Sequence, residues 1–85
     1  KFPELTAERR RDLVKIINET SEKFKVSIRN IRRKYIDFIK DSEKDKQISI
    51  DESKKSQDDV QKFTDNSIFE IDTLAKQKEN DILKV

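Results

Sequence analysis

A seven-residue spacing runs through the first half of this 85-residue chain, and it limits the possible folds more than any other feature. Two neighbouring lines carry the mostly apolar pattern: Val14, Ser21, Ile28 and Tyr35, and Ile17, Phe24, Ile31 and Phe38. A stripe of this width is typical of a helix packed into a bundle. The chain has no glycine and one proline, Pro3, so nothing interrupts the pattern before the polar stretch 41–47. We therefore predict a helix over about residues 7–43, with Thr6 as its N-cap.

The second half of the chain contains a clear start signal for another helix. Ser49 and Glu52 have the spacing of a capping box, in which each side chain binds the other residue's backbone amide. Apolar and small residues then continue at helical spacing: Val60, Thr64, Ile68, Ile71, Leu74, Ala75, Ile82 and Val85. We predict a turn at about 44–48 and a helix over about 49–84. The fold class is therefore all-α: residues 1–85 form one domain, a long antiparallel two-helix hairpin.

The apolar stripes are wider than the seam between two helices requires. Two antiparallel helices cover only part of each other's stripe, and small scaffolds without staples have little stability to spare. We therefore expect a missing partner, either a third helix or a second copy of the chain in a homodimer. The alternative is that the extra apolar positions are ordinary exposed residues. Phe24, Tyr35 and Phe38 are assigned to the core stripe, so no aromatic platform for stacked bases is expected.

The composition excludes several classes of function. Cysteine, histidine, methionine, tryptophan and glycine are all absent, which removes thiol and zinc chemistry, the usual neutral-pH general base and any phosphate-cradling glycine loop. We expect no catalytic residues, no metal and no cofactor. The acidic pairs at 51–52 and 58–59 are better explained by helix first turns than by a cation site. The longest apolar run has two residues, so no membrane-spanning segment is predicted.

Positive charge is concentrated on the first predicted helix. Residues 7–44 hold 12 basic and 7 acidic side chains, whereas residues 45–85 hold 7 basic and 10 acidic ones. On a helical projection, one sector contains seven cations and a single acid, Glu22; we call these cations the basic ridge: Arg11, Lys15, Lys25, Arg29, Arg32, Arg33 and Lys40. Such a row can follow a phosphate backbone. The alternative is a solvated face with ordinary ion pairs such as Glu22 with Lys25. Arg10 and Arg32 project close to the apolar stripe, where a cation is awkward without a partner.

Three segments resemble a known family. The segment 5–13 (LTAERRRDL) resembles the L-T-x-E-R-R-x-x-L segment of bacterial and organellar ribosome recycling factors. The segment 28–33 (IRNIRR) is similar to the V-R-N-x-R-R segment of that family, and 56–65 (SQDDVQKFTD) to its S-x-D-x-V-Q-x-L-T-D segment. The three motifs occur in the family's order and spacing, and they extend over nearly the whole chain.

The resemblance implies a fold, a function and a set of partners. The two helices correspond to the second and third helices of an elongated three-helix bundle, with the first helix and an inserted β-rich domain absent from this chain. The family is not enzymatic and needs no cofactor of its own. It implies binding to the ribosomal RNA of the large subunit and, with elongation factor G and GTP, splitting of the post-termination ribosome. The implied location is the bacterial cytoplasm, or alternatively the matrix of mitochondria or plastids.

The resemblance also implies which residues contact RNA. Carried over position by position, they are Arg10, Arg29 and Arg32, together with Arg33. The rival function is an antiparallel coiled-coil module that binds a protein and no RNA. Salt dependence separates the two, because RNA docking weakens steeply with added salt whereas apolar pairing does not.

Overall fold

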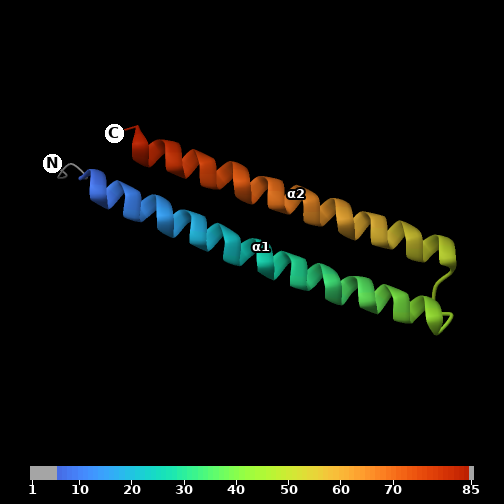
Figure 1. Ribbon diagram of the computed structural model, residues 1–85. Helices are drawn as coiled ribbons and strands as arrows, with labels where there is room; N and C mark the ends of the chain where they lie inside the picture. Colours follow the sequence, from blue (N-terminus) through green and yellow to red (C-terminus); the bar gives the residue numbers. More distant parts are fainter. Residues whose placement is uncertain (1–5, 85) are drawn as a thin grey trace.

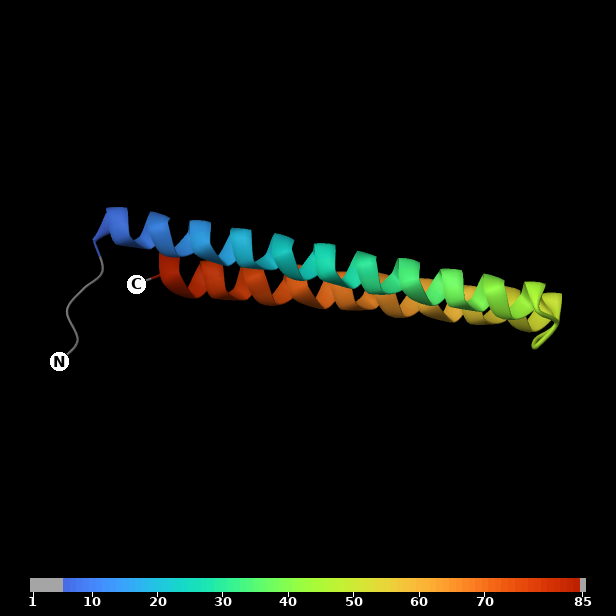
Figure 2. The same ribbon diagram turned by 90° about the horizontal axis from the view of Figure 1, so that it is seen from below.

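Two long antiparallel helices make up the described part of the computed structural model, which covers residues 6–84. Helix α1 spans Ala7–Lys44 and helix α2 spans Ile50–Leu83. They lie side by side along their full length, with the start of α1 and the end of α2 at one end of the molecule (Figure 1). The second view shows the same rod-like arrangement (Figure 2), and the molecule measures 63 × 17 × 15 Å. The predicted all-α hairpin is confirmed.

Both helices begin where the sequence predicts, because a side chain satisfies their first free amides. The Thr6 hydroxyl accepts a hydrogen bond from the backbone amide of Arg9 at 3.0 Å. At the start of α2, the Ser49 hydroxyl accepts from the Glu52 amide, and the Glu52 carboxylate accepts from the Ser49 amide, both at 3.1 Å. The predicted capping box is therefore confirmed.

The turn between the helices contains a backbone conformation that no sequence pattern predicts. Lys46 has a φ of +60°, in the left-handed region that usually belongs to glycine. Its amide donates to the Glu43 carbonyl at 3.0 Å, and the Gln47 amide donates to the Ser42 carbonyl at 2.8 Å. These two bonds form the Schellman pattern that ends many helices. Because the chain has no glycine, a lysine adopts this conformation.

The core of the hairpin is a thin seam. Among the described residues, only Ile39, Ser53 and Thr64 are buried. Ser53 is fully buried, and small side chains of this kind let the two helix backbones approach closely. The hydroxyl of Thr64 is satisfied by the Val60 carbonyl of its own helix at 2.8 Å. The seam therefore joins the two helices without a wide apolar interior.

The prediction that Phe24, Tyr35 and Phe38 lie in the core is wrong for the hairpin. Their exposed fractions are 58 %, 58 % and 69 %, and Ile31 is also exposed at 53 %. The reason is geometric: α2 covers only one edge of the α1 stripe, and these residues occupy the other edge. The apolar stripe is thus wider than the seam between the two helices, as expected, and the excess side chains are exposed.

Two predicted features lie outside the described residues: Leu5, which opens the first motif, and Val85, which ends the second stripe. Within residues 6–84, neither helix is long and apolar enough to cross a membrane.

Candidate nucleic-acid interface

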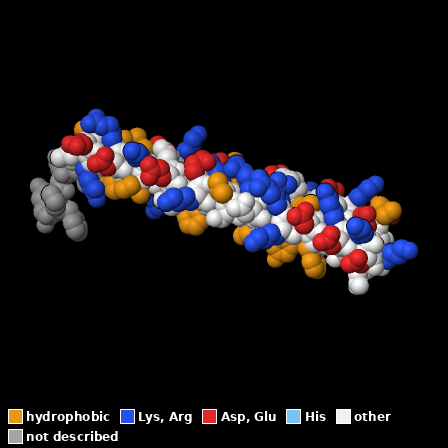
Figure 3. All heavy atoms as spheres, turned by 60° about the horizontal axis from the view of Figure 1, so that its bottom comes forward, with side chains coloured by type: hydrophobic (Ala, Val, Ile, Leu, Met, Phe, Trp, Pro, Cys, Tyr) orange, Lys and Arg blue, Asp and Glu red, His pale blue; other side chains and the backbone are white. Residues whose placement is uncertain are grey.

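The basic ridge forms one exposed face of α1. Arg11, Lys15, Arg29, Arg33 and Lys40 are exposed, and Lys25 and Arg32 are half-buried. Figure 3 shows Lys and Arg side chains recurring along one face among acidic ones, with hydrophobic groups gathered along its lower margin. Within the described residues, Lys25 is the only cation that forms an ion pair with a carboxylate. The arginines of the ridge therefore keep their charge uncompensated by any carboxylate among these residues.

Arg10 and Arg32 project toward the seam, as the helical spacing predicts. Both are half-buried, whereas Arg29 and Arg33 are exposed. The Nε atom of Arg10 is buried and has no hydrogen-bond partner among residues 6–84. Arg33 donates from Nη1 to the side-chain oxygen of Asn30 at 3.5 Å, one turn before it on α1. The four predicted RNA-contacting arginines thus divide into two that lie against the seam and two that face solvent.

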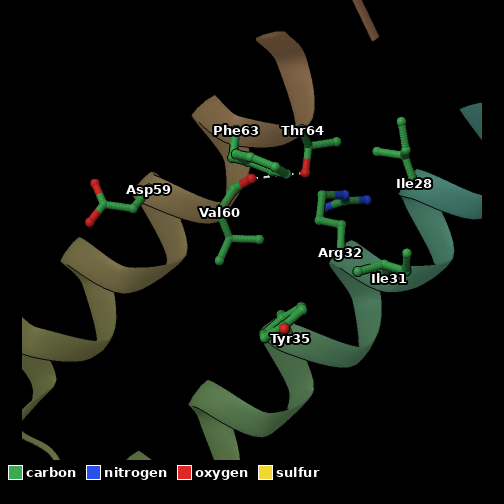
Figure 4. Close-up of a pocket in the computed structure, with 8 residues that line it drawn as sticks. All are labelled: Ile28, Ile31, Arg32, Tyr35, Asp59, Val60, Phe63 and Thr64. Carbon is green, nitrogen blue, oxygen red and sulfur yellow. Dashed lines mark hydrogen bonds between the residues drawn. The ribbon is translucent and has the colours of Figure 1, made fainter. Parts of the chain in front are cut away.

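Arg32 is held by a contact that crosses from α1 to α2. Its Nη1 donates to the Oε1 atom of Gln61 at 3.4 Å, and the Nε2 atom of Gln61 donates to the Asp65 Oδ1 atom at 2.9 Å. The close-up shows the Arg32 side chain reaching from α1 toward α2, beside Thr64 (Figure 4). Gln61 and Asp65 belong to the third motif, but no pattern in the sequence indicates that they take part in the site. Their positions can be read from the sequence, but only the register of the two helices shows that Gln61 lies opposite Arg32.

Lys25 makes the other polar crossing between the helices. Its ammonium pairs with the Asp72 carboxylate of α2 and with Glu22 of α1, the latter at 3.3 Å. The Asp72 carboxylate raises the pKa of the Lys25 ammonium, Glu22 acts in the same direction, and partial burial opposes both. The predicted Glu22–Lys25 pair is confirmed. Lys25 is therefore a neutralised member of the basic ridge.

A groove between α1 and α2 carries exposed apolar side chains, and Arg32, which makes the first of these crossings, is one of the residues that line it. Two cavities of about 330 and 390 Å³ lie along it, and most of their lining is apolar. The first is lined by Ile28, Ile31, Tyr35, Val60 and Phe63, with Arg32, Asp59 and Thr64 beside them. The second is lined by Ile16, Ile17, Phe24, Ile71, Leu74 and Ala75, with Thr20, Ser21 and Lys78 beside them. We call this surface the apolar groove. Figure 4 shows the first cavity, into which the Tyr35 and Val60 side chains point from opposite helices. An apolar surface of this length on a small protein marks an interaction site.

The described residues contain no group of three or more acidic side chains placed to hold a metal ion. Glu52 has the capping role assigned to it from the sequence, and Asp51 lies beside it in the first turn of α2. The first-turn explanation is wrong for Asp58 and Asp59, because α2 begins at Ile50 and they lie beyond its first turn. The side chains of the site offer guanidinium groups at fixed spacing on a helix, a chemistry that suits the oxygen atoms of phosphate groups.

Fold and site together define a class: part of an elongated helical bundle that carries a row of cations on α1 and an apolar groove between its two helices. A family model described as "Ribosome recycling factor" matches residues 1–83. Curated proteins named "Ribosome-recycling factor" are similar over 84 residues, which is 99 % of this chain and 45 % of each relative. Identity is 54 % with the protein of Carboxydothermus hydrogenoformans, 52 % with that of Symbiobacterium thermophilum and 48 % with that of Azoarcus sp..

The chain belongs to the ribosome recycling factor family. It spans about half the length of the curated relatives that it matches.

Proposed function

We propose that this chain is the part of a ribosome recycling factor that docks on the ribosomal RNA of the large subunit. Arg10, Arg29, Arg32 and Arg33 contact the phosphate backbone in this proposal. The single observation that carries it is the uncompensated charge of the arginines on a face of a chain from this family. Arginine forks that lack a carboxylate partner are free to bind phosphate oxygens.

The whole protein, in this proposal, works with elongation factor G and GTP to split the post-termination ribosome, and this chain supplies affinity without catalysing a reaction. The relatives named above are bacterial, which supports the bacterial cytoplasm as the place of action over the mitochondrial or plastid matrix. A stiff helix suits this role because it holds the guanidinium groups at fixed spacing before they meet the RNA.

Co-sedimentation with purified large ribosomal subunits across a salt series tests the docking proposal. We expect Arg32→Ala to weaken binding by about 1–3 kcal/mol and to reduce the slope of log K against log salt by about one. Circular dichroism checks that the helices remain. Unchanged affinity in a folded Arg32→Ala variant contradicts the role of Arg32.

Binding that does not respond to salt supports instead the rival function, a coiled-coil module that pairs with a protein. The apolar groove gives this alternative its physical basis, because apolar contacts are insensitive to ionic strength.

We further infer that the apolar groove takes one more helix of the bundle in the whole protein, and a second copy of the chain when these two helices are alone. The contacts Arg32–Gln61 and Lys25–Asp72 show the register of the two helices. By helical spacing, this register places two exposed lysines beside the groove on α1 level with two exposed acids beside it on α2. The pairs are Lys34 with Asp59, and Lys23 with Glu70.

These four charges favour one of the two symmetric homodimers. If both turns lie at the same end of a four-helix bundle, α1 faces α2 of the other copy and each lysine meets an acid. If the turns lie at opposite ends, each helix faces its own copy and like charges meet. Light scattering should give the mass of two chains at high micromolar concentration, and a strictly monomeric mass contradicts the homodimer.

The arrangement can be tested with one label, since the chain has no cysteine. A spin label on Lys46→Cys should give a short distance between copies. A distance approaching the 63 Å length of the molecule indicates turns at opposite ends.

A further inference from the structure

The hydrogen-bond chain from Arg32 to Asp65 has only one possible direction. A guanidinium group can only donate, and an ionised carboxylate can only accept. Gln61 lies between them and has one accepting oxygen and one donating NH₂ group. Because Asp65 takes the NH₂ group at 2.9 Å, the oxygen must face Arg32, where it accepts at 3.4 Å. Asp65 therefore fixes the orientation of Gln61, and Gln61 presents an acceptor to Arg32.

This chain holds Arg32 without neutralising it. Gln61 is uncharged, and it engages one terminal nitrogen of a group that has five N–H donors. The remaining donors stay free for a ligand. Arg32 is also half-buried against the seam, so the stem of the side chain is restrained by packing while its head is oriented by α2. Arg29, by contrast, is exposed and has no cross-helix hydrogen bond among the described residues.

We propose that Gln61, oriented by Asp65, is a positioning residue that holds the Arg32 guanidinium ready for an RNA phosphate. The inference rests on the proposed docking function and names the part of α2 that takes part in it. Ordering a long side chain before binding lowers the entropy lost when the contact forms. The Arg32 contact is then stronger than that of an arginine that must be ordered by the RNA itself.

A double-mutant cycle tests this proposal with the full 85-residue chain and purified large ribosomal subunits. The variants are Gln61→Ala, Arg32→Ala and the double variant, with Gln77→Ala as the matched control, an exposed glutamine elsewhere on α2. We expect Gln61→Ala to weaken binding about threefold to tenfold. In the Arg32→Ala background the same substitution should have no further effect. Gln77→Ala should bind like the unsubstituted chain, and circular dichroism should be the same for all four.

A second measurement follows the side chain directly in the free protein. Relaxation of the Arg32 Nε–Hε group by NMR should show greater mobility in Gln61→Ala, and a smaller increase in Asp65→Ala, where Gln61 remains but can rotate. A purely structural role for Gln61 does not predict this local effect.

The outcomes separate the two proposals. Equal losses from Gln61→Ala in both backgrounds, or unchanged Arg32 mobility, overturn the positioning role and leave RNA docking standing. If Arg32→Ala itself binds like the unsubstituted chain, the docking role of Arg32 fails, and the positioning role in RNA binding fails with it.

Discussion

Two cations of α1 reach across to α2 in a similar way, but they meet side chains of different charge. Lys25 and Arg32 are seven residues apart on α1, both are half-buried, and both reach across the seam to a polar side chain of α2. Lys25 meets the carboxylate of Asp72, whereas Arg32 meets the amide oxygen of Gln61. The carboxylate of Asp72 compensates the charge of Lys25, whereas the uncharged amide of Gln61 leaves the charge of Arg32 uncompensated. The residue that a cation meets on α2 therefore determines whether the charge of that cation is compensated within the protein.

The two crossings also differ in how many of their hydrogen-bonding groups are already used within the protein. The Lys25 pair is closed within the protein, and the Glu22 carboxylate strengthens it from the same helix. The Arg32 contact is open, because a single long hydrogen bond of 3.4 Å leaves most of its donors unused. In the proposed docking, an RNA phosphate would displace a single uncharged acceptor at Arg32, but at Lys25 it would compete with two carboxylates. The proposal therefore assigns docking to Arg32 and not to Lys25.

Among changes to the residues of α2 that meet these two cations, the largest expected effect comes from making the Arg32 crossing resemble the Lys25 crossing. Gln61→Glu places a carboxylate beside Arg32, which then competes with phosphate for the guanidinium group. We expect affinity for large ribosomal subunits to fall by more than about tenfold, beyond the loss expected for Gln61→Ala, because a carboxylate competes directly with phosphate for the guanidinium group. Co-sedimentation at low salt measures this, with circular dichroism as the control. Affinity equal to that of Gln61→Ala shows that charge at position 61 has no influence.

The converse change makes the Lys25 crossing resemble the Arg32 crossing. Asp72→Asn keeps the shape of the side chain, removes its charge and leaves Lys25 paired with Glu22 alone. We expect affinity for the subunits to rise about twofold to threefold at low salt, because one more cation of the ridge becomes available. The same variant should lower the midpoint of thermal unfolding by a few degrees at most, since ion pairs near the surface contribute little. Weaker binding contradicts the assignment of Lys25 to the ridge.

The smallest expected effect is on the pH dependence of stability. The pKa of Lys25 is raised in the folded chain, so its contribution to stability is fully present below the lysine pKa of the unfolded chain, about 10.4. It is lost as the pH rises through the raised folded value. The difference in unfolding midpoint between the unsubstituted chain and Asp72→Asn should therefore be constant near neutral pH and shrink above about pH 10.4. Thermal unfolding followed by circular dichroism gives both midpoints. A difference that stays constant up to high alkaline pH contradicts the role of the Lys25–Asp72 pair.

Much of the fold follows from patterns that are local along the chain. The capping residues Thr6, Ser49 and Glu52 predict both helix starts, because each forms its hydrogen bond with a residue only three positions away. The long uninterrupted helices follow from the absence of glycine and the position of the single proline. The placement of Arg10 and Arg32 against the seam follows from helical spacing, which fixes the angle between any two residues of one helix. The end of α1 does not follow in the same way, because Lys46 occupies a left-handed turn position usually taken by glycine.

The order of residues along the chain is enough to predict two helices, their starts, the one-sided charge of α1 and a stripe too wide for one neighbour. The packing of α2 against α1 sets which edge of that stripe is covered, and it leaves Phe24, Tyr35 and Phe38 exposed. It also decided that Arg32 meets Gln61 while Lys25 meets Asp72. The physical reason is that helical periodicity fixes angles within one helix, whereas contacts between helices depend on their rotation and register. Rotation and register are set by the packing of the whole seam, in which small residues such as Ser53 allow close approach.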